Sequence, residues 1–246
     1  MWRWIINGIF FSFLFLLSAG AKGKFFEGKV VYDITTGDEH YELAVFTKGS
    51  HLRLDLKDLN TNQRSTLIFS DDGIVVVDHK QKLAMHLPAL PPQFQQLLQP
   101  SNPKLFYFPD LPASSLEVLE KGGKVIQRLP NGIRLSIDQA GTKSVKGRQC
   151  QRWIFQNLDT KERVEVCLAR GLGSFFLTPD LTRQMLKELK NSPIAQRLFP
   201  LEMVYYRNNQ KETTIIVTDI DTTPPSASVF QIPRSYRIQQ PFGNDH

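Results

Sequence analysis

The sequence has 246 residues, 41% of them hydrophobic, and a formal net charge of +6. This length fits one large β-rich domain or two small ones. The lysines and arginines are scattered and no nucleic-acid-binding motif accompanies them, so the composition does not indicate a nucleic-acid partner. Mild basicity can favour anionic lipid surfaces, but a charge this small more often reflects solubility alone.

The first 21 residues have the layout of a secretory signal peptide. Arg3 is their only charge, residues 5–17 are an apolar run, and small residues precede a predicted cleavage after Ala21. The alternative, a membrane anchor, is disfavoured because the run is too short to span a bilayer comfortably. Gly20 stands where a lipid-modified cysteine would be expected. We therefore expect a periplasmic protein that does not span the membrane after cleavage.

Residues 25–87 follow a period of two, as in the sequence HLRLDL at positions 51–56, where each leucine follows a polar residue. Such alternation is typical of an antiparallel strand with one wet face. Turn-forming residues separate the alternating segments at short intervals. The pattern predicts a meander of about six strands, with His51 on a wet face and His79 in a turn.

Residues 88–112 interrupt this rhythm with a segment that is rich in proline and yet strongly apolar. A short helix is expected at residues 92–98, with Pro92 in its first turn. One interpretation is a plug that covers one end of the sheet; the other is a lid over a hydrophobic cavity. Both place the same side chains inward, and these are the tentative ligand or lid residues Phe94, Leu97, Leu98, Phe106 and Phe108.

Strands are expected to resume at residues 115–121, 124–130 and 132–137, with a hairpin turn at Asn131-Gly132. Thr178, followed by proline and aspartate, predicts the start of a helix that ends at Asn191, and a second short helical piece follows. Residues 201–207 and 211–220 predict a final hairpin through Asn208-Asn209, followed by an extended segment over residues 228–237. Residues 241–246 are expected to be a disordered tail.

Both cysteines lie in a predicted hairpin formed by residues 149–155 and 161–169. Folding the polar break about Leu158-Asp159 places Cys150 opposite Cys167 and Arg152 opposite Glu165, with Trp153 opposite Val164 on the other face. This register, together with the predicted export, favours a disulfide over two independent reduced cysteines.

Together these elements predict a single, mainly β domain over residues 22–240. We expect a large curved antiparallel sheet with a few helices on its concave side.

Three segments resemble a family of bacterial exported proteins catalogued only as a domain of unknown function. The central one is Lys143-x-Val145-x-Gly147-x-x-Cys150-x-x-Trp153, and the opening strand FEGKVVYDIT is similar to the first strand of the family. The third comprises LEMVYYR, KETTIIVTDI and then Phe230-x-x-Pro233-x-x-Tyr236. The sequence departs from the family where Cys167 occupies a position expected to be tryptophan.

The resemblance implies a fold similar to that of the LolA-like periplasmic lipoprotein carriers. That fold is a half-open β-barrel with helices filling the opening and a cavity that can hold acyl chains. Fold does not settle function, and no lipid-binding residue can be transferred by motif.

No signature of a metalloprotease, a redox CxxC pair, a phosphate-binding loop or a nucleophile elbow occurs, and no metal or cofactor is expected. Three hypotheses follow. The favoured one is a binder of a hydrophobic ligand, such as a lipid or a lipoprotein acyl chain. The second is an envelope interaction or sensing module with a filled core and a protein partner. The third, an enzyme, is disfavoured because no acid/base or nucleophile constellation appears.

Overall fold

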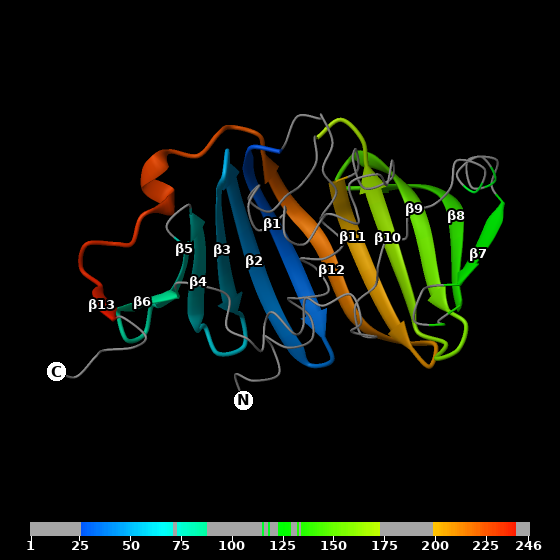
Figure 1. Ribbon diagram of the computed structural model, residues 1–246, viewed down its shortest axis with the longest axis horizontal. Coiled ribbons are helices and arrows are strands. Elements are labelled where there is room, and N and C mark those ends of the chain that lie inside the picture. The colour runs from blue at the N-terminus through cyan, green and yellow to red at the C-terminus, as the bar shows by residue number, and fades with distance from the viewer. Residues whose placement is uncertain are drawn as a thin grey trace.

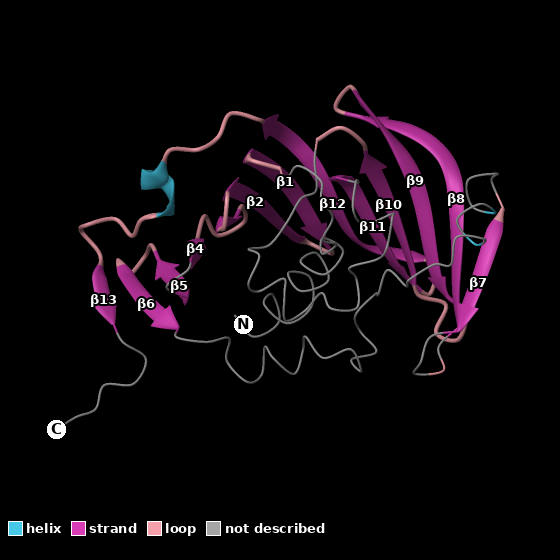
Figure 2. Cartoon of the chain, turned by 45° about the horizontal axis from the view of Figure 1, so that its top comes forward, coloured by secondary structure: helices cyan, strands magenta, loops and turns pink. Residues whose placement is uncertain are grey.

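The structure is a computed structural model that describes residues 26–70, 73–87, 115, 118, 123–128, 132, 134–172 and 199–239. These residues form one 13-stranded sheet in the order β13-β6-β5-β4-β3-β2-β1-β12-β11-β10-β9-β8-β7 (Figure 1). All neighbouring strands are antiparallel except β13, which runs parallel to β6. The sheet is curved but not closed, and β13 and β7 form its two edges (Figure 2). This confirms the mainly β, open antiparallel architecture predicted from the sequence.

The strands follow the predicted alternation closely. Their bounds are β1 Gly28–Thr36, β2 Glu39–Lys48, β3 His51–Asp58, β4 Arg64–Ser70, β5 Gly73–Asp78, β6 Leu83–Leu87, β7 Lys124–Arg128, β8 Arg134–Val145, β9 Arg148–Asn157, β10 Arg163–Ala169, β11 Phe199–Arg207, β12 Gln210–Asp221 and β13 Arg237–Gln239. The six-strand meander is therefore confirmed as β1 to β6.

Two meanders meet at the centre of the sheet. The first runs outward from β1 to β6, and the second runs inward from β7 to β12. They join where β12 pairs with β1, with Ile34 opposite Ile215 and Tyr32 opposite Val217. Tight turns set the register of the second meander: Lys146 and Gly147 have φ values of 48° and 75°, and Asn208 and Asn209 have 51° and 62°. Positive φ at both central residues suits the turn to the twist of the strands that it joins.

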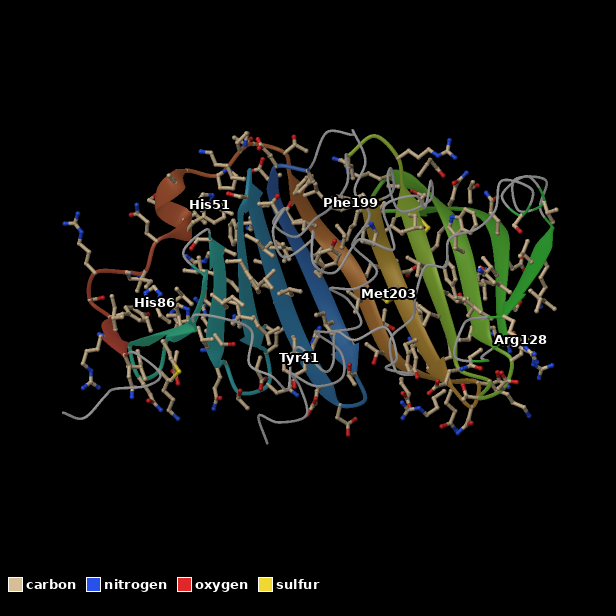
Figure 3. All side chains as sticks on the ribbon, in the orientation of Figure 1. Tyr41, His51, His86, Arg128, Phe199 and Met203 are labelled. Carbon is tan, nitrogen blue, oxygen red and sulfur yellow. A yellow bond between two sulfur atoms is a disulfide. The ribbon has the colours of Figure 1, made fainter. Side chains whose placement is uncertain are left out.

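One face of the sheet is continuously apolar from β3 to β8, and we call it the apolar face. The register aligns its side chains across neighbouring strands, as in the row Trp153, Val166, Met203, Ile215 and Ile34. The buried members of this face are Val30, Tyr32, Ile34, Tyr41, Leu43, Val45, Leu52, Leu54, Leu135, Ile137, Trp153, Phe155, Val164, Val166, Leu168, Leu201, Met203, Ile215 and Val217. Figure 3 shows the side chains on the sheet, with Tyr41 and Met203 labelled.

The other face, which we call the polar face, is partly covered by the C-terminal segment. A second apolar cluster on it joins Ile68, Val75, Val77 and Ala84 to Phe230. This corrects the expectation of a wet face for residues 51–56: the His51 ring lies 5.5 Å from the Phe230 ring. Arg53 Nη1 donates a hydrogen bond to the Val229 carbonyl at 2.7 Å. The alternation predicts the strand correctly, but the local sequence contains no sign that a distant segment returns to cover the polar side chains.

Two further expectations are wrong in part. Ser115 and Val118 are helical, so the strand predicted to begin at residue 115 is wrong at these two described residues. Ser114-x-x-Glu117 is a capping-box signal that could have indicated a helix here. The segment after β12 is not extended throughout, because Ala227–Phe230 forms a 3-10 helix, η1. The helices expected at residues 92–98 and 178–191 lie outside the described residues.

Candidate functional site

The cysteine hairpin, β9 and β10, carries the disulfide between Cys150 and Cys167, whose Cα atoms are 5.4 Å apart. The predicted pairing is confirmed, but the predicted register is wrong by two residues. Cys150 lies opposite Ala169, Cys167 lies opposite Arg152, and Trp153 lies opposite Val166. The cysteines are therefore diagonal neighbours on one face, which is also within reach of a disulfide.

The turn explains the shifted register. Asn157 Oδ1 accepts hydrogen bonds from the backbone N–H groups of Asp159 and Thr160, at 2.9 and 3.2 Å. Lys161 then adopts a φ of 60°. These contacts close a loop over residues 158–161, which is centred one residue further along the chain than the predicted fold about Leu158-Asp159. The asparagine side chain stabilises this local turn and so fixes the shifted register.

On the polar face, charged side chains surround the disulfide. Arg152 Nη2 lies 2.5 Å from Glu165 Oε2, and Lys143 is paired with Glu202. The hydrogen bond to Glu165 raises the pKa of Arg152. These side chains line a shallow hollow of about 350 Å³. Each of these cations already has a carboxylate partner. We therefore interpret the residues that line the hollow as structural ion pairs.

The apolar face is the stronger candidate for a binding surface, because Trp153 and Gln139 bring polar atoms into it. Trp153 on β9 is 4% exposed. Gln139 on β8 lies opposite it in the register, so both side chains leave the sheet on the same face. Trp153 Nε1 and Gln139 Oε1 are both buried and have no hydrogen-bond partner among the residues that the structure describes. An unsatisfied buried polar group costs about 1–3 kcal/mol.

Two other buried polar groups near this face, the Tyr32 and Thr47 hydroxyls, are satisfied within the protein. The Tyr32 hydroxyl donates to the Pro200 carbonyl at 3.2 Å, and the Thr47 hydroxyl donates to the Phe26 carbonyl at 2.8 Å. Burial raises the pKa of Tyr32 well above its ordinary value. Within the described sheet, the indole and the amide therefore stand out from these satisfied groups. In the sequence, Trp153 stands out only as a motif residue and as the predicted cross-strand partner of Val164, and no signal marks Gln139.

On the polar face, His79 connects the sheet to the C-terminal segment. Thr66 Oγ1 donates to Asp55 Oδ1 at 2.5 Å and lies 2.8 Å from His79 Nε2, while His79 Nδ1 lies 2.8 Å from the Tyr236 hydroxyl. Since the Thr66 proton goes to Asp55, Nε2 must donate and Nδ1 must accept the Tyr236 proton. Burial lowers the pKa of His79. These hydrogen bonds link Asp55 to Tyr236 through Thr66 and His79, and they hold Tyr236 against the sheet.

Three further features of the sequence concern metal ligands, membrane spans and the predicted lid. Among the described residues, no group of three or more histidines, cysteines, aspartates or glutamates could hold a metal ion. No helix in the described part of the chain is both long and apolar enough to cross a membrane. Ala21 and the tentative lid residues Phe94, Leu97, Leu98, Phe106 and Phe108 lie outside the described residues, so their roles stay predictions.

Residues 127–236 match a family described as a domain of unknown function, DUF4412. The match includes the motif from Lys143 to Trp153 and the one from Phe230 to Tyr236, and it confirms the resemblance to a family of uncharacterised domains. No curated protein matches the chain.

Two solved structures are similar over most of their length. One is an uncharacterised conserved protein from Thermus thermophilus, with 7% identity, a TM-score of 0.47, and coverage of 86% of this chain and 88% of that one. The other is a DUF1329 family protein from Desulfovibrio piger, with 10% identity, a TM-score of 0.18, and coverage of 83% and 88%. Neither description names an activity or a ligand.

Proposed function

We propose that the protein is an exported, non-enzymatic binder of a hydrophobic ligand, an acyl chain, which lies along the apolar face. The observation that supports this function is the continuity of that face from β3 to β8 on a sheet that does not close. An acyl chain buried there gains roughly 0.8 kcal/mol for each methylene group removed from water. The resemblance to the LolA-like carriers points in the same direction.

Export to the periplasm is the second part of the proposal. The disulfide between Cys150 and Cys167 is consistent with an oxidising compartment. The apolar run that ends before Ala21 supplies the predicted signal. The intact mass of protein isolated from the cell envelope is expected to correspond to a chain that begins at Lys22 and lacks two hydrogen atoms because of the disulfide. A chain that keeps its first 21 residues would contradict the predicted cleavage.

A protein partner is the second candidate function, and one observation favours it. Ile126 lies on the edge strand β7 and is 63% exposed. An edge strand presents unpaired backbone groups, and a partner strand can add to them. Capture of one specific envelope protein that is lost in an Ile126→Ser variant would support this candidate.

Native mass spectrometry of protein purified from its own envelope, with lipid extraction of the same sample, tests the primary proposal. A co-purifying acyl species, and uptake of a fluorescent fatty acid by the emptied protein, are the expected results. Phe94→Ser and Phe106→Ser test whether the segment over residues 88–112 acts as a lid over a cavity or as a plug, while Ile126→Ser is the control that should leave uptake unchanged. Protein that carries no lipid and takes up no probe would overturn the proposal.

A further inference from the structure

We propose that Trp153 and Gln139 form a polar recognition point for the head of an amide-linked acyl chain. The ligand carbonyl would accept a hydrogen bond from the Trp153 indole N–H, and the ligand N–H would donate to Gln139 Oε1. This inference rests on the proposed function, because it assumes that the apolar face takes up an acyl chain, and it names the chemical class of that ligand.

The two side chains are placed side by side by the strands that carry them. Gln139 on β8 and Trp153 on β9 are partners across the ladder, so their side chains leave the sheet on the same face. The register of β8 shifts directly after Gln139, between Gln139 and Thr142. A β-bulge at such a point commonly changes the direction in which a side chain points.

Their hydrogen-bonding capacity is complementary to a secondary amide. An indole can only donate, and an amide oxygen can only accept. Neither Trp153 Nε1 nor Gln139 Oε1 has a partner in the described part of the chain, although both atoms are buried. Since the great majority of buried side-chain polar atoms are paired, two adjacent exceptions of opposite character indicate a group that supplies one acceptor and one donor.

The apolar side chains around this pair fit the rest of such a ligand. Val166 lies opposite Trp153 on β10, and Phe155 is two residues along β9 on the same face. Both belong to the main apolar cluster and are buried. A polar pair within an apolar surface is the usual design of a small-molecule site, where few polar groups fix the orientation of a largely apolar ligand.

The test compares the binding of an N-methyl fatty amide with that of the methyl ester of the same acyl chain. The ester carbonyl can accept from Trp153, but the ester has no N–H to donate to Gln139. We expect the full chain to bind the amide about tenfold more tightly than the ester. Gln139→Leu should abolish this preference, and Trp153→Phe should weaken both probes about tenfold.

Two controls separate a lost hydrogen bond from lost folding. Gln151→Leu makes the same change on the same face of β9, at a residue paired with Leu168. Gln151 Oε1 already accepts from Arg170 Nη2 at 3.4 Å. This variant should keep the amide preference, and a thermal melt of each variant establishes that it is folded. Should Trp153→Phe not fold, the loss of preference in Gln139→Leu still decides the question.

The outcomes distinguish this inference from the function on which it rests. Equal affinity for the amide and the ester in the wild-type chain, or a preference that persists in Gln139→Leu, would overturn the recognition point while leaving acyl binding in place. Failure of the wild-type chain to bind either probe would overturn both.

Discussion

At the scale of single residues, the disulfide between Cys150 and Cys167 links two strands that already pair, over a sequence separation of 17. A link of this length is expected to stabilise the protein by roughly 3 kcal/mol, because it restricts the unfolded chain. The double variant Cys150→Ala, Cys167→Ala should lower the free energy of unfolding by about that amount in a urea titration. Single variants expose one free thiol and serve as the comparison. An unchanged unfolding midpoint would show that pairing of β9 and β10 alone holds the hairpin.

The free energy of unfolding is expected to depend on pH through the lowered pKa of His79. Burial holds its pKa in the folded protein below the ordinary value, and the nearby Asp55 only partly opposes this. The unfolded chain therefore binds more protons at mildly acidic pH. The contribution of His79 is fully present above a pH of about 6.5 and is lost as the pH falls from there to its folded pKa.

We accordingly expect His79→Asn to flatten the fall in unfolding free energy between pH of about 7.5 and 5, measured by denaturant titration at each pH. Tyr236→Phe is the matched control. It removes the hydrogen bond to Nδ1 but keeps most of the burial, which is the largest cause of the lowered pKa, so it should lower stability while keeping most of the slope. A slope that is identical in His79→Asn and the wild type would rule out this histidine as its source.

The disulfide and the Trp153–Gln139 pair show which features could be predicted from the sequence and which could not. The pairing of Cys150 with Cys167 could be predicted because both fall on one face of a hairpin, and a slip of two residues preserves the face. The register itself could not, because it depends on whether Asn157 bonds the backbone of its own turn. Trp153 and Gln139 were not identified as a pair, since their proximity depends on the β8–β9 register and the bulge after Gln139.

At the scale of elements, the segment from η1 to β13 acts as a cover for the polar face of β4, β5 and β6. Phe230 is 8% exposed and anchors the second apolar cluster. Loss of a buried phenylalanine side chain typically costs about 3–5 kcal/mol of unfolding free energy. We expect about 3 kcal/mol for Phe230→Ala because this cluster is small.

Hydrogen exchange should show the loss of backbone protection mainly in β5, β6 and β13. Ile238→Ala, at a residue that is 61% exposed, should leave the exchange pattern unchanged; uniform loss of protection across all strands would contradict a local role.

Strands were predictable where the period of two was strong, because a half-buried strand requires it. The error at Ser115 and Val118 occurred in a short leucine- and valine-containing segment that fits both periods, and only the capping signal could separate them. The return of η1 over β3 could not be derived locally. It depends on contacts between residues far apart in the sequence, such as Arg53 with the Val229 carbonyl.

At the scale of the whole molecule, the pairing of β1 with β12 decides whether the two meanders fold as one unit. Each meander is built from neighbours in sequence, whereas β1 and β12 join segments more than 170 residues apart in the register Ile34 with Ile215. Ile215 also lies opposite Met203 on β11, so it is paired on both sides. A central strand of this kind does not tolerate proline, which removes a ladder hydrogen bond.

We therefore expect Ile215→Pro to lower the free energy of unfolding by at least about 1–3 kcal/mol, because a buried ladder group is left without its hydrogen bond, and to make the two meanders unfold separately. Ile215→Ala is the control for the lost side chain and should retain a single transition. Ile126→Pro, on β7, should also retain it, because that strand is an edge of the described sheet and pairs there with β8. Differential scanning calorimetry distinguishes the cases. A single transition in Ile215→Pro, at an unchanged midpoint, would mean that the apolar face alone couples the two halves, and that the β1–β12 ladder adds little to the cooperativity of the fold.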